Sequence, residues 1–171
     1  MAHEREAVMP LGPQALTGNA AFAMSVALLF LRLALGWTFI FHGLQLTIGA
    51  FGGLGVNGFA EHMPAMPAFL PKIVWAYLAA YGQLIGGISV MLGLLARLGT
   101  VPIIVSMVVA IVTVHAPSGF DIQHRPTVGY EYNMNLIAMA LAILLAGPGL
   151  ISVDALLFRR GLWARGPQPL R

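Results

Sequence analysis

The chain has 171 residues, of which 58% are hydrophobic and only 9% are charged, with a net charge of +3 and no cysteine. Soluble domains carry roughly 25% charged residues, so this composition excludes an ordinary soluble protein and indicates a membrane protein. The small net charge argues against a nucleic-acid partner, and the missing thiols exclude disulfide exchange and iron–sulfur ligation by this chain.

Four long apolar runs follow one another along the chain, and we expect each to be a transmembrane helix. They lie at about 24–48, 73–95, 98–115 and 130–152. Runs of this length cross a hydrocarbon core of roughly 30 Å, with the third at the short limit. Because backbone groups in lipid have no water to bond, continuous apolar runs favour helices over a barrel. The sequence therefore predicts an all-α membrane protein, a four-transmembrane-helix bundle over 24–155, with tails at 1–23 and 156–171.

The arginines indicate how this bundle is oriented. With an even number of spans, both tails and the short connection near Arg97 share one side, and the loops 49–72 and 116–129 share the other. The first side holds Arg5, Arg97, Arg159, Arg160, Arg165 and Arg171. The loops hold only Lys72 and Arg125, so the positive-inside rule predicts that both termini are cytoplasmic. The loop at 49–72 is rich in glycine and proline, and either moves freely or folds over the mouth of the bundle.

Arg32 is the only charged residue between Ala7 and Ala60. A charge inside a membrane span costs about 2.5–3.5 kcal/mol, so this residue requires a partner. Helical side chains lean toward the N-terminus of their helix, which on this helix is the cytoplasmic side. We therefore expect Arg32 to link to Asp154, directly or through water, as a structural charge pair that clasps the bundle.

Glycines at helical spacing predict close contacts between the spans. Gly82 and Gly86 form a small-xxx-small pair, Gly93 lies one heptad further on, and Gly36 with Gly43 does the same for the first span. Small residues let helix backbones approach closely in a membrane, so we expect tight helix packing at these positions.

Polar side chains gather in the predicted outer half of the bundle. They are His42, Gln45, Gln83, His115, Glu131 and Asn135, with Tyr77 and Tyr81 nearby. His42 and Gln45 are three residues apart and share a helix face. Polar groups that face lipid cost free energy, so we expect this outer cup to point into the bundle or toward a partner.

The outer cup is compatible with several roles. A quinone head group needs donors for its carbonyls and apolar walls for its tail, which His42, Gln83 or His115 with a tyrosine would supply. A b-type haem between His42 and His115 is a weaker alternative, because axial ligation needs facing rings and a tall cavity. A hydrogen-bonded network that only fixes helix register also remains open.

Metal binding is the least favoured role for these polar groups. It would have to use His115, Asp121 and His124, or Glu61 and His62, and neither spacing matches a recognised zinc pattern. We therefore predict no metal site and no certain cofactor.

Short motifs recur in a characteristic order along the chain. They are LRLALG at 31–36, FHG at 41–43, GG at 86–87, LGL at 92–94, HAPSGF at 115–120, GYEYN at 129–133 and GPGLISVD at 147–154. By their order and spacing, the chain resembles the DoxX/DoxD-like family of small four-helix membrane proteins over about residues 28–157.

The resemblance implies a bacterial inner-membrane protein tied to redox metabolism, because founding members of the family belong to a thiosulfate:quinone oxidoreductase. Gln45 stands near a place where members often carry a lysine, and Gln83 where they often carry a glutamate. An amide keeps hydrogen bonding and loses titration, which argues against independent catalysis. We expect a membrane subunit of quinone-linked redox metabolism, with the lipid bilayer and other membrane subunits as partners. The alternative is a non-catalytic structural or assembly subunit of a larger electron-transfer or photosynthetic complex.

Overall fold

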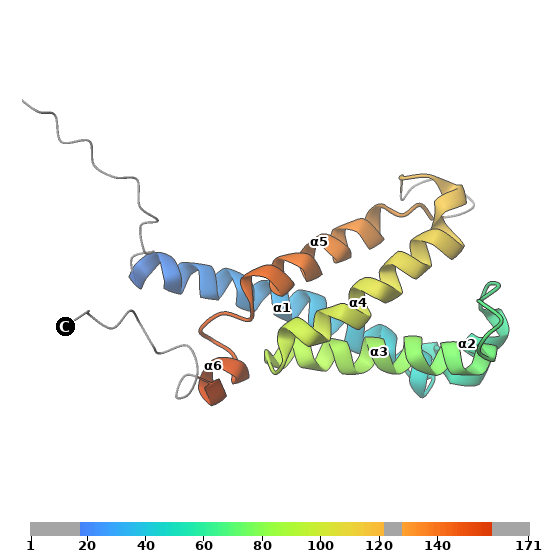
Figure 1. The fold of residues 1–171 in the computed structure, drawn as a ribbon, viewed down its shortest axis with the longest axis horizontal. Helices are drawn as coiled ribbons and strands as arrows, with labels where there is room; N and C mark the ends of the chain where they lie inside the picture. The colour runs from blue at the N-terminus through green and yellow to red at the C-terminus, as the bar shows by residue number, and fades with distance from the viewer. Residues whose placement is uncertain (1–17, 122–127, 159–171) are drawn as a thin grey trace, which may run out of the picture.

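The computed structural model describes residues 18–121 and 128–158, and all regular secondary structure in these ranges is helical (Figure 1). The α-helices are α1 (Gly18–Thr47), α2 (Gly55–His62), α3 (Lys72–Leu92), α4 (Ala96–Ala110), α5 (Glu131–Ala146) and α6 (Val153–Phe158). Shorter helical turns are η1 (Ala50–Gly52), η2 (Ile111–His115) and η3 (Ala116–Ser118). Most of both predicted tails, together with His124 and Arg125, lies outside the described residues.

Three helices are long and apolar enough to cross a membrane, and they comprise Gly18–Thr47, Lys72–Leu92 and Ala96–Ser118. The predicted fourth span is α5, which has 16 residues. At a rise of about 1.5 Å per residue it is about 24 Å long, somewhat less than a hydrocarbon core of roughly 30 Å. The all-helical membrane architecture is thus established, whereas a fourth complete crossing stays a prediction.

Several helix boundaries differ from the predicted ones. The first helix begins at Gly18 and not near residue 24, and its 30 residues span about 45 Å. The second span ends at Leu92, and the tight connection lies at residues 93–95, because Gly93 has a left-handed φ of 67°. The predicted fourth helix ends at Ala146, since Gly147 adopts a φ of 84° that L-residues avoid. The predicted span at about 130–152 therefore extends past the end of α5.

The glycines make the helix contacts that their spacing predicts. A Cβ atom added to Gly36 would lie 2.6 Å from the Cβ of Met91, and one on Gly43 would lie 2.6 Å from the Cα of Leu84. These contacts seat α1 along the length of α3. A Cβ on Gly86 would lie 2.7 Å from the carbonyl oxygen of Gly99, where α3 crosses α4.

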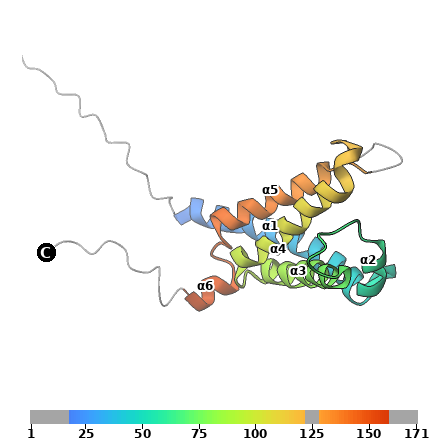
Figure 2. The same cartoon turned by 45° about the vertical axis from the view of Figure 1, so that its right-hand side comes forward.

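The bundle has two chemically different ends, which we name by their connections. The turn end carries residues 93–95 and 147–152, and the loop end carries residues 48–71, 111–121 and 128–130. Between them lies an apolar core shared by α1, α3, α4 and α5, made of Leu35, Phe39, Val90, Ala96, Ile103, Leu136, Ala140 and Ile143. At the loop end α2 lies beside the start of α3, as both cartoon views show (Figures 1 and 2).

Candidate functional site

The α3 and α4 helices cross and then diverge toward the loop end (Figure 1). They touch at Gly86 and Gly99, and a Cβ on Gly82 would lie 3.3 Å from the ring of Pro102. Beyond this crossing the two helices diverge, because larger side chains replace the glycines. The crossing therefore fixes where the crevice begins.

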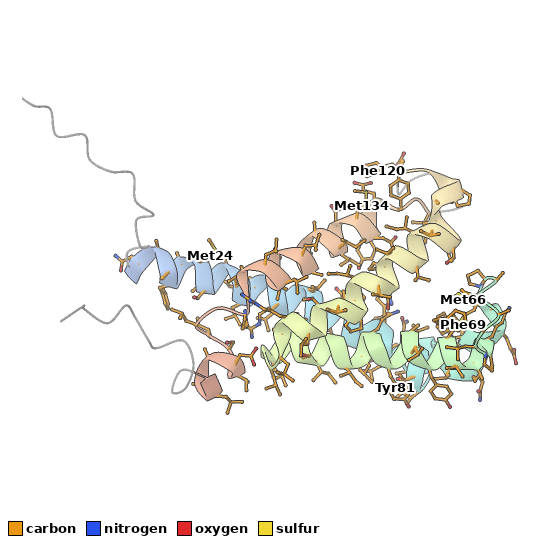
Figure 3. All side chains as sticks on the ribbon, viewed as in Figure 1. Met24, Met66, Phe69, Tyr81, Phe120 and Met134 are labelled. Atoms are coloured by element: carbon orange, nitrogen blue, oxygen red, sulfur yellow. The ribbon has the colours of Figure 1, made fainter. Side chains whose placement is uncertain are left out.

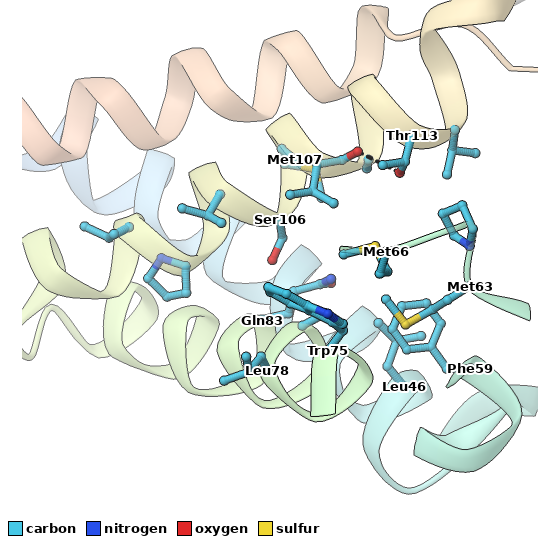
Figure 4. A pocket seen from close by; sticks show the side chains of 18 residues that line it. Leu46, Phe59, Met63, Met66, Trp75, Leu78, Gln83, Ser106, Met107 and Thr113 are labelled. Atoms are coloured by element: carbon cyan, nitrogen blue, oxygen red, sulfur yellow. Dashed lines mark hydrogen bonds between the residues drawn. The ribbon is translucent and has the colours of Figure 1, made fainter. Parts of the chain in front are cut away.

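A cavity of about 490 Å³ occupies this crevice, within the range of roughly 300–1,000 Å³ typical of small-molecule pockets (Figure 4). Its lining is predominantly apolar. The residues are Leu46, Phe59, Met63, Pro64, Met66, Trp75, Leu78, Ala79, Gln83, Val101, Pro102, Val105, Ser106, Met107, Val109, Ala110, Thr113 and Val114. The loop at 49–72 contributes Phe59, Met63, Pro64 and Met66 to this list, so the loop folds over the mouth of the bundle.

Gln83 is the most distinctive polar group in the cavity. Its side chain points from α3 into the crevice and is only 8% exposed (Figure 4). Within the described part of the chain, its amide has no hydrogen-bond partner, and the Ser106 hydroxyl opposite on α4 also lacks one. Every fully buried side-chain nitrogen or oxygen among the described residues has a hydrogen-bond partner, so the Gln83 amide faces the open space of the cavity. A ligand there that accepts hydrogen bonds can pair with this amide.

Other polar atoms of the cavity already have partners. The indole Nε1–H of Trp75 donates to the carbonyl oxygen of Pro67 at 3.2 Å, and the Thr113 hydroxyl donates to that of Val109 at 2.8 Å. Thr113 lies in η2, a π-helical turn that widens the end of α4. Such turns are frequent at functional sites, and here the turn brings Thr113 and Val114 to the cavity wall.

Of the predicted members of the outer cup, Gln83 lines this cavity and the others lie outside its lining. His42 and Gln45 bond to each other on α1, with 3.0 Å between Nδ1 and Oε1. His115 donates from Nδ1 to the carbonyl oxygen of Val128 at 2.9 Å. Among the described residues, no group of three or more histidines and carboxylates is placed to hold a metal ion.

Three predicted members lie on outward faces. Tyr77 and Tyr81 stack on each other and are 48% and 43% exposed, and Tyr81 extends from α3 on the side away from α4 (Figure 3). Asn135 is exposed, whereas Asn133 is buried and donates to the sulfur of Met107 at 3.3 Å. The spacing of residues 133, 136, 140 and 143, which form the inner face of α5, would have identified the buried asparagine.

Arg32 lies at the turn end, although it is central in the longest apolar run. It is 2% exposed, and its guanidinium donates to four backbone carbonyls. These belong to Val90 (3.0 Å) and Met91 (3.1 Å) at the end of α3, and to Pro148 and Ile151 (both 2.7 Å) after α5. Arg32 therefore ties α1, α3 and the segment after α5 together.

Asp154 lies near Arg32 but uses its carboxylate elsewhere. Its two oxygens accept from the backbone N–H groups of Leu95 (2.8 Å) and Ala96 (3.2 Å), at the start of α4. The predicted pair thus shares one end of the bundle, where Asp154 attracts Arg32 electrostatically. The hydrogen bonds of the two side chains go to backbone groups of different segments, because the Asp154 carboxylate is directed toward the start of α4.

Comparison with known proteins identifies the same region. The family model described as DoxX matches residues 27–116, a segment that contains every residue lining the cavity. An uncharacterized protein of Haemophilus influenzae is 27% identical over 135 residues, which cover 77% of this chain and 83% of that protein. No solved structure matches the chain.

Proposed function

The chain belongs to the DoxX family of membrane proteins, and we propose that it is a membrane subunit of quinone-linked redox metabolism that holds a quinone between α3 and α4. The observation that carries this proposal is the Gln83 amide, which is buried, unpartnered among the described residues and directed into an apolar cavity. Ligand sites typically combine apolar walls with a few well-placed polar groups.

The chemistry of the lining suits a quinone head group. Quinone carbonyls accept hydrogen bonds, and the Gln83 amide offers two N–H donors while Ser106 offers one O–H donor. Trp75, Phe59 and the methionines Met63 and Met66 supply flat and polarisable surface for the ring. A quinone accepts two electrons and two protons when it is reduced to a quinol, and the role of these residues would be to hold and orient it.

We assign the electron donor to a separate subunit. The chain contains no cysteine, and within its described part the cavity lining contains no carboxylate, histidine or tyrosine. Gln83 and Ser106 do not titrate near neutral pH, so proton delivery also requires groups outside the cavity. These features favour a subunit that positions quinone for a partner protein.

We further propose the bacterial inner membrane as the location, with both termini in the cytoplasm and the loop end outside. The proposal is supported by the arginines in the tails and near the turn end, compared with the few basic residues in the two long loops. The lipid bilayer and other membrane subunits are the partners that this arrangement requires.

Binding of decylubiquinone to the protein in lipid nanodiscs tests the function directly. We expect Gln83→Leu to weaken binding at least about tenfold, because a lost hydrogen bond to a carbonyl is worth about 1.4 kcal/mol in a dry site. The matched control is Gln45→Leu, which removes an amide that bonds to His42 outside the cavity, and binding should stay unchanged. Wild-type affinity in Gln83→Leu would overturn the assignment.

A non-catalytic assembly subunit is the second candidate function. It is favoured by the exposed His42 and Asn135, which place polar groups on outward faces of α1 and α5 where a partner helix would satisfy them. Purification in mild detergent should then recover a partner at fixed stoichiometry, and His42→Ala with Asn135→Ala should release it. A stable monomer that binds quinone would contradict this candidate.

A further inference from the structure

We infer that the ligand of this cavity is an uncharged, tailed lipid that enters from the bilayer between α3 and α4, and that the loop at 49–72 closes the route from water. The inference rests on the proposed function for the identity of the head group. The entry route follows from the cavity walls alone and is measured separately.

One flank of the cavity is open and entirely apolar. Leu78 on α3 is 57% exposed, and Val101 and Val105 on α4 are 46% and 55% exposed, yet all three line the cavity. In a chain with membrane-spanning helices, this flank lies within the span of α3 and α4 and therefore meets lipid acyl chains. Nothing in the described residues covers it, so a tail can pass from the cavity into the bilayer.

The opposite, loop-end side of the cavity is closed by packed structure. Val56, Ala60 and Met63 from α2 and the residue after it are buried against Ala76 and Ala80 of α3. Water would have to displace this cluster in order to reach Gln83 from the loop end.

Two side-chain hydrogen bonds hold the loop in this position. The Lys72 ammonium donates to the carbonyl oxygen of Met63 at 3.1 Å, and the Trp75 indole donates to that of Pro67 at 3.2 Å. Both donors stand on the first turn of α3, so the loop is fastened to the helix that carries Gln83. The loop therefore acts as a roof and not as the entrance.

The lining also limits the chemical class of the ligand. Within the described part of the chain, no charged side chain lines the cavity, and a charged head group would lose its hydration without compensation. The ligand is therefore neutral, with a hydrogen-bond acceptor at the level of Gln83 and Ser106 and an apolar tail that leaves past Val105. Tailed quinones meet this description, and tail-less quinones dissolved in water meet it only in part.

Fluorescence quenching of Trp75 tests the route without any ligand. In a Trp37→Phe, Trp163→Phe background, Trp75 is the remaining indole of the three in the chain. We expect lipids brominated on their acyl chains to quench it strongly and aqueous iodide to quench it weakly. The matched control keeps Trp37, which is 58% exposed on α1, as the remaining indole and should show lipid quenching at full strength. Strong iodide quenching with no lipid quenching of Trp75 would overturn the inference.

Two further variants separate the flank from the roof. Val105→Phe narrows the flank, so it should reduce lipid quenching and lower the preference for decylubiquinone over tail-less ubiquinone at least about threefold relative to wild type. Comparing this preference between the variant and wild type cancels the partitioning of each quinone into the membrane, which does not depend on the variant. Lys72→Met removes the hydrogen bond to Met63 that holds the loop, so it should raise iodide quenching of Trp75. An unchanged preference for decylubiquinone in Val105→Phe would contradict lateral entry.

The two proposals fail in different ways. If Gln83→Leu leaves quinone affinity unchanged while lipid quenching of Trp75 holds, the proposed function falls and the lipid-facing route stands. If Gln83→Leu weakens binding while iodide reaches Trp75 freely, quinone binding stands and lateral entry falls.

Discussion

The two ends of the bundle use buried polar groups in opposite ways. At the turn end, Arg32 donates to four carbonyls and Asp154 accepts from two backbone N–H groups. At the loop end, Gln83 is almost as well buried, yet its amide has no partner among the described residues. The same membrane environment thus contains a polar cluster that is complete and one that is not.

This difference separates stabilising polar residues from residues available to a ligand. Arg32 replaces lipid and water as the partner of backbone groups that their own helices leave free at α3's end and after α5. Gln83 makes no hydrogen bond among the described residues and lines the cavity, which supports the proposed ligand site. Charge alone would have selected Arg32 as the functional residue, whereas hydrogen-bond partners select Gln83.

The largest expected effect comes from breaking the complete cluster. Arg32→Met should lower the free energy of unfolding by about 3 kcal/mol or more, because four backbone carbonyls lose a charged donor. Thermal unfolding in detergent measures this, and Arg97→Met is the control, since the exposed Arg97 side chain makes a single hydrogen bond within the described residues, to the Leu145 carbonyl at 3.2 Å. If Arg32→Met matched that control, the turn end would not be the stabilising end.

The crossing between the two ends is the next most sensitive point. Gly86→Val should destabilise by about 1–3 kcal/mol, because its new side chain would meet the Gly99 backbone. Gly18→Ala at the start of α1 has no atom within 4 Å of its added Cβ and should unfold at the wild-type temperature. A tolerated Gly86→Val would show that α3 and α4 do not need close contact to define the crevice.

A smaller effect is expected at the second residue of the turn end. Asp154→Ala should cost about 1 kcal/mol, the usual value for losing an oxygen that caps the first N–H groups of a helix. Asp154→Asn keeps one acceptor oxygen and should retain part of that stability in the same unfolding assay. Equal losses in both variants would indicate that attraction to Arg32, and not capping of α4, is the main contribution of Asp154.

The smallest effect on stability is expected at Gln83. Gln83→Leu should change the free energy of unfolding by no more than about 0.5 kcal/mol, because no described hydrogen bond is lost. Asn133→Leu, which loses the contact with the Met107 sulfur, is the comparison. If ligand-free Gln83→Leu lost more than about 2 kcal/mol of unfolding free energy, Gln83 would be a stabilising residue like Arg32.

Features that depend on neighbours along the chain were predicted well. The apolar runs indicated helices and a membrane, and the glycine spacing predicted the contacts of Gly36, Gly43 and Gly86. The DoxX resemblance was confirmed by the family match. Each of these features depends on local conformation or on the periodicity of a single helix, and both can be read from the sequence.

Which side chains face inward depends on how each helix is rotated about its own axis, and this was harder to predict from the sequence. The outer cup grouped residues by depth, but Tyr77, Tyr81 and Asn135 turn outward, while Asn133 turns inward. Ser106, Thr113 and the methionines of the cavity carried no signal in the sequence, because ordinary apolar helices contain the same residues.

The sequence by itself determined that this is a helical membrane protein with one isolated charge and a few polar groups. Only the tertiary structure decided that the charge is satisfied at the turn end and that the Gln83 amide faces a cavity between α3 and α4. The physical reason is that a hydrogen-bond partner is set by how helices cross and where their neighbours end. The partners of Arg32 lie 58 to 119 residues away along the chain, at a distance that no local pattern encodes.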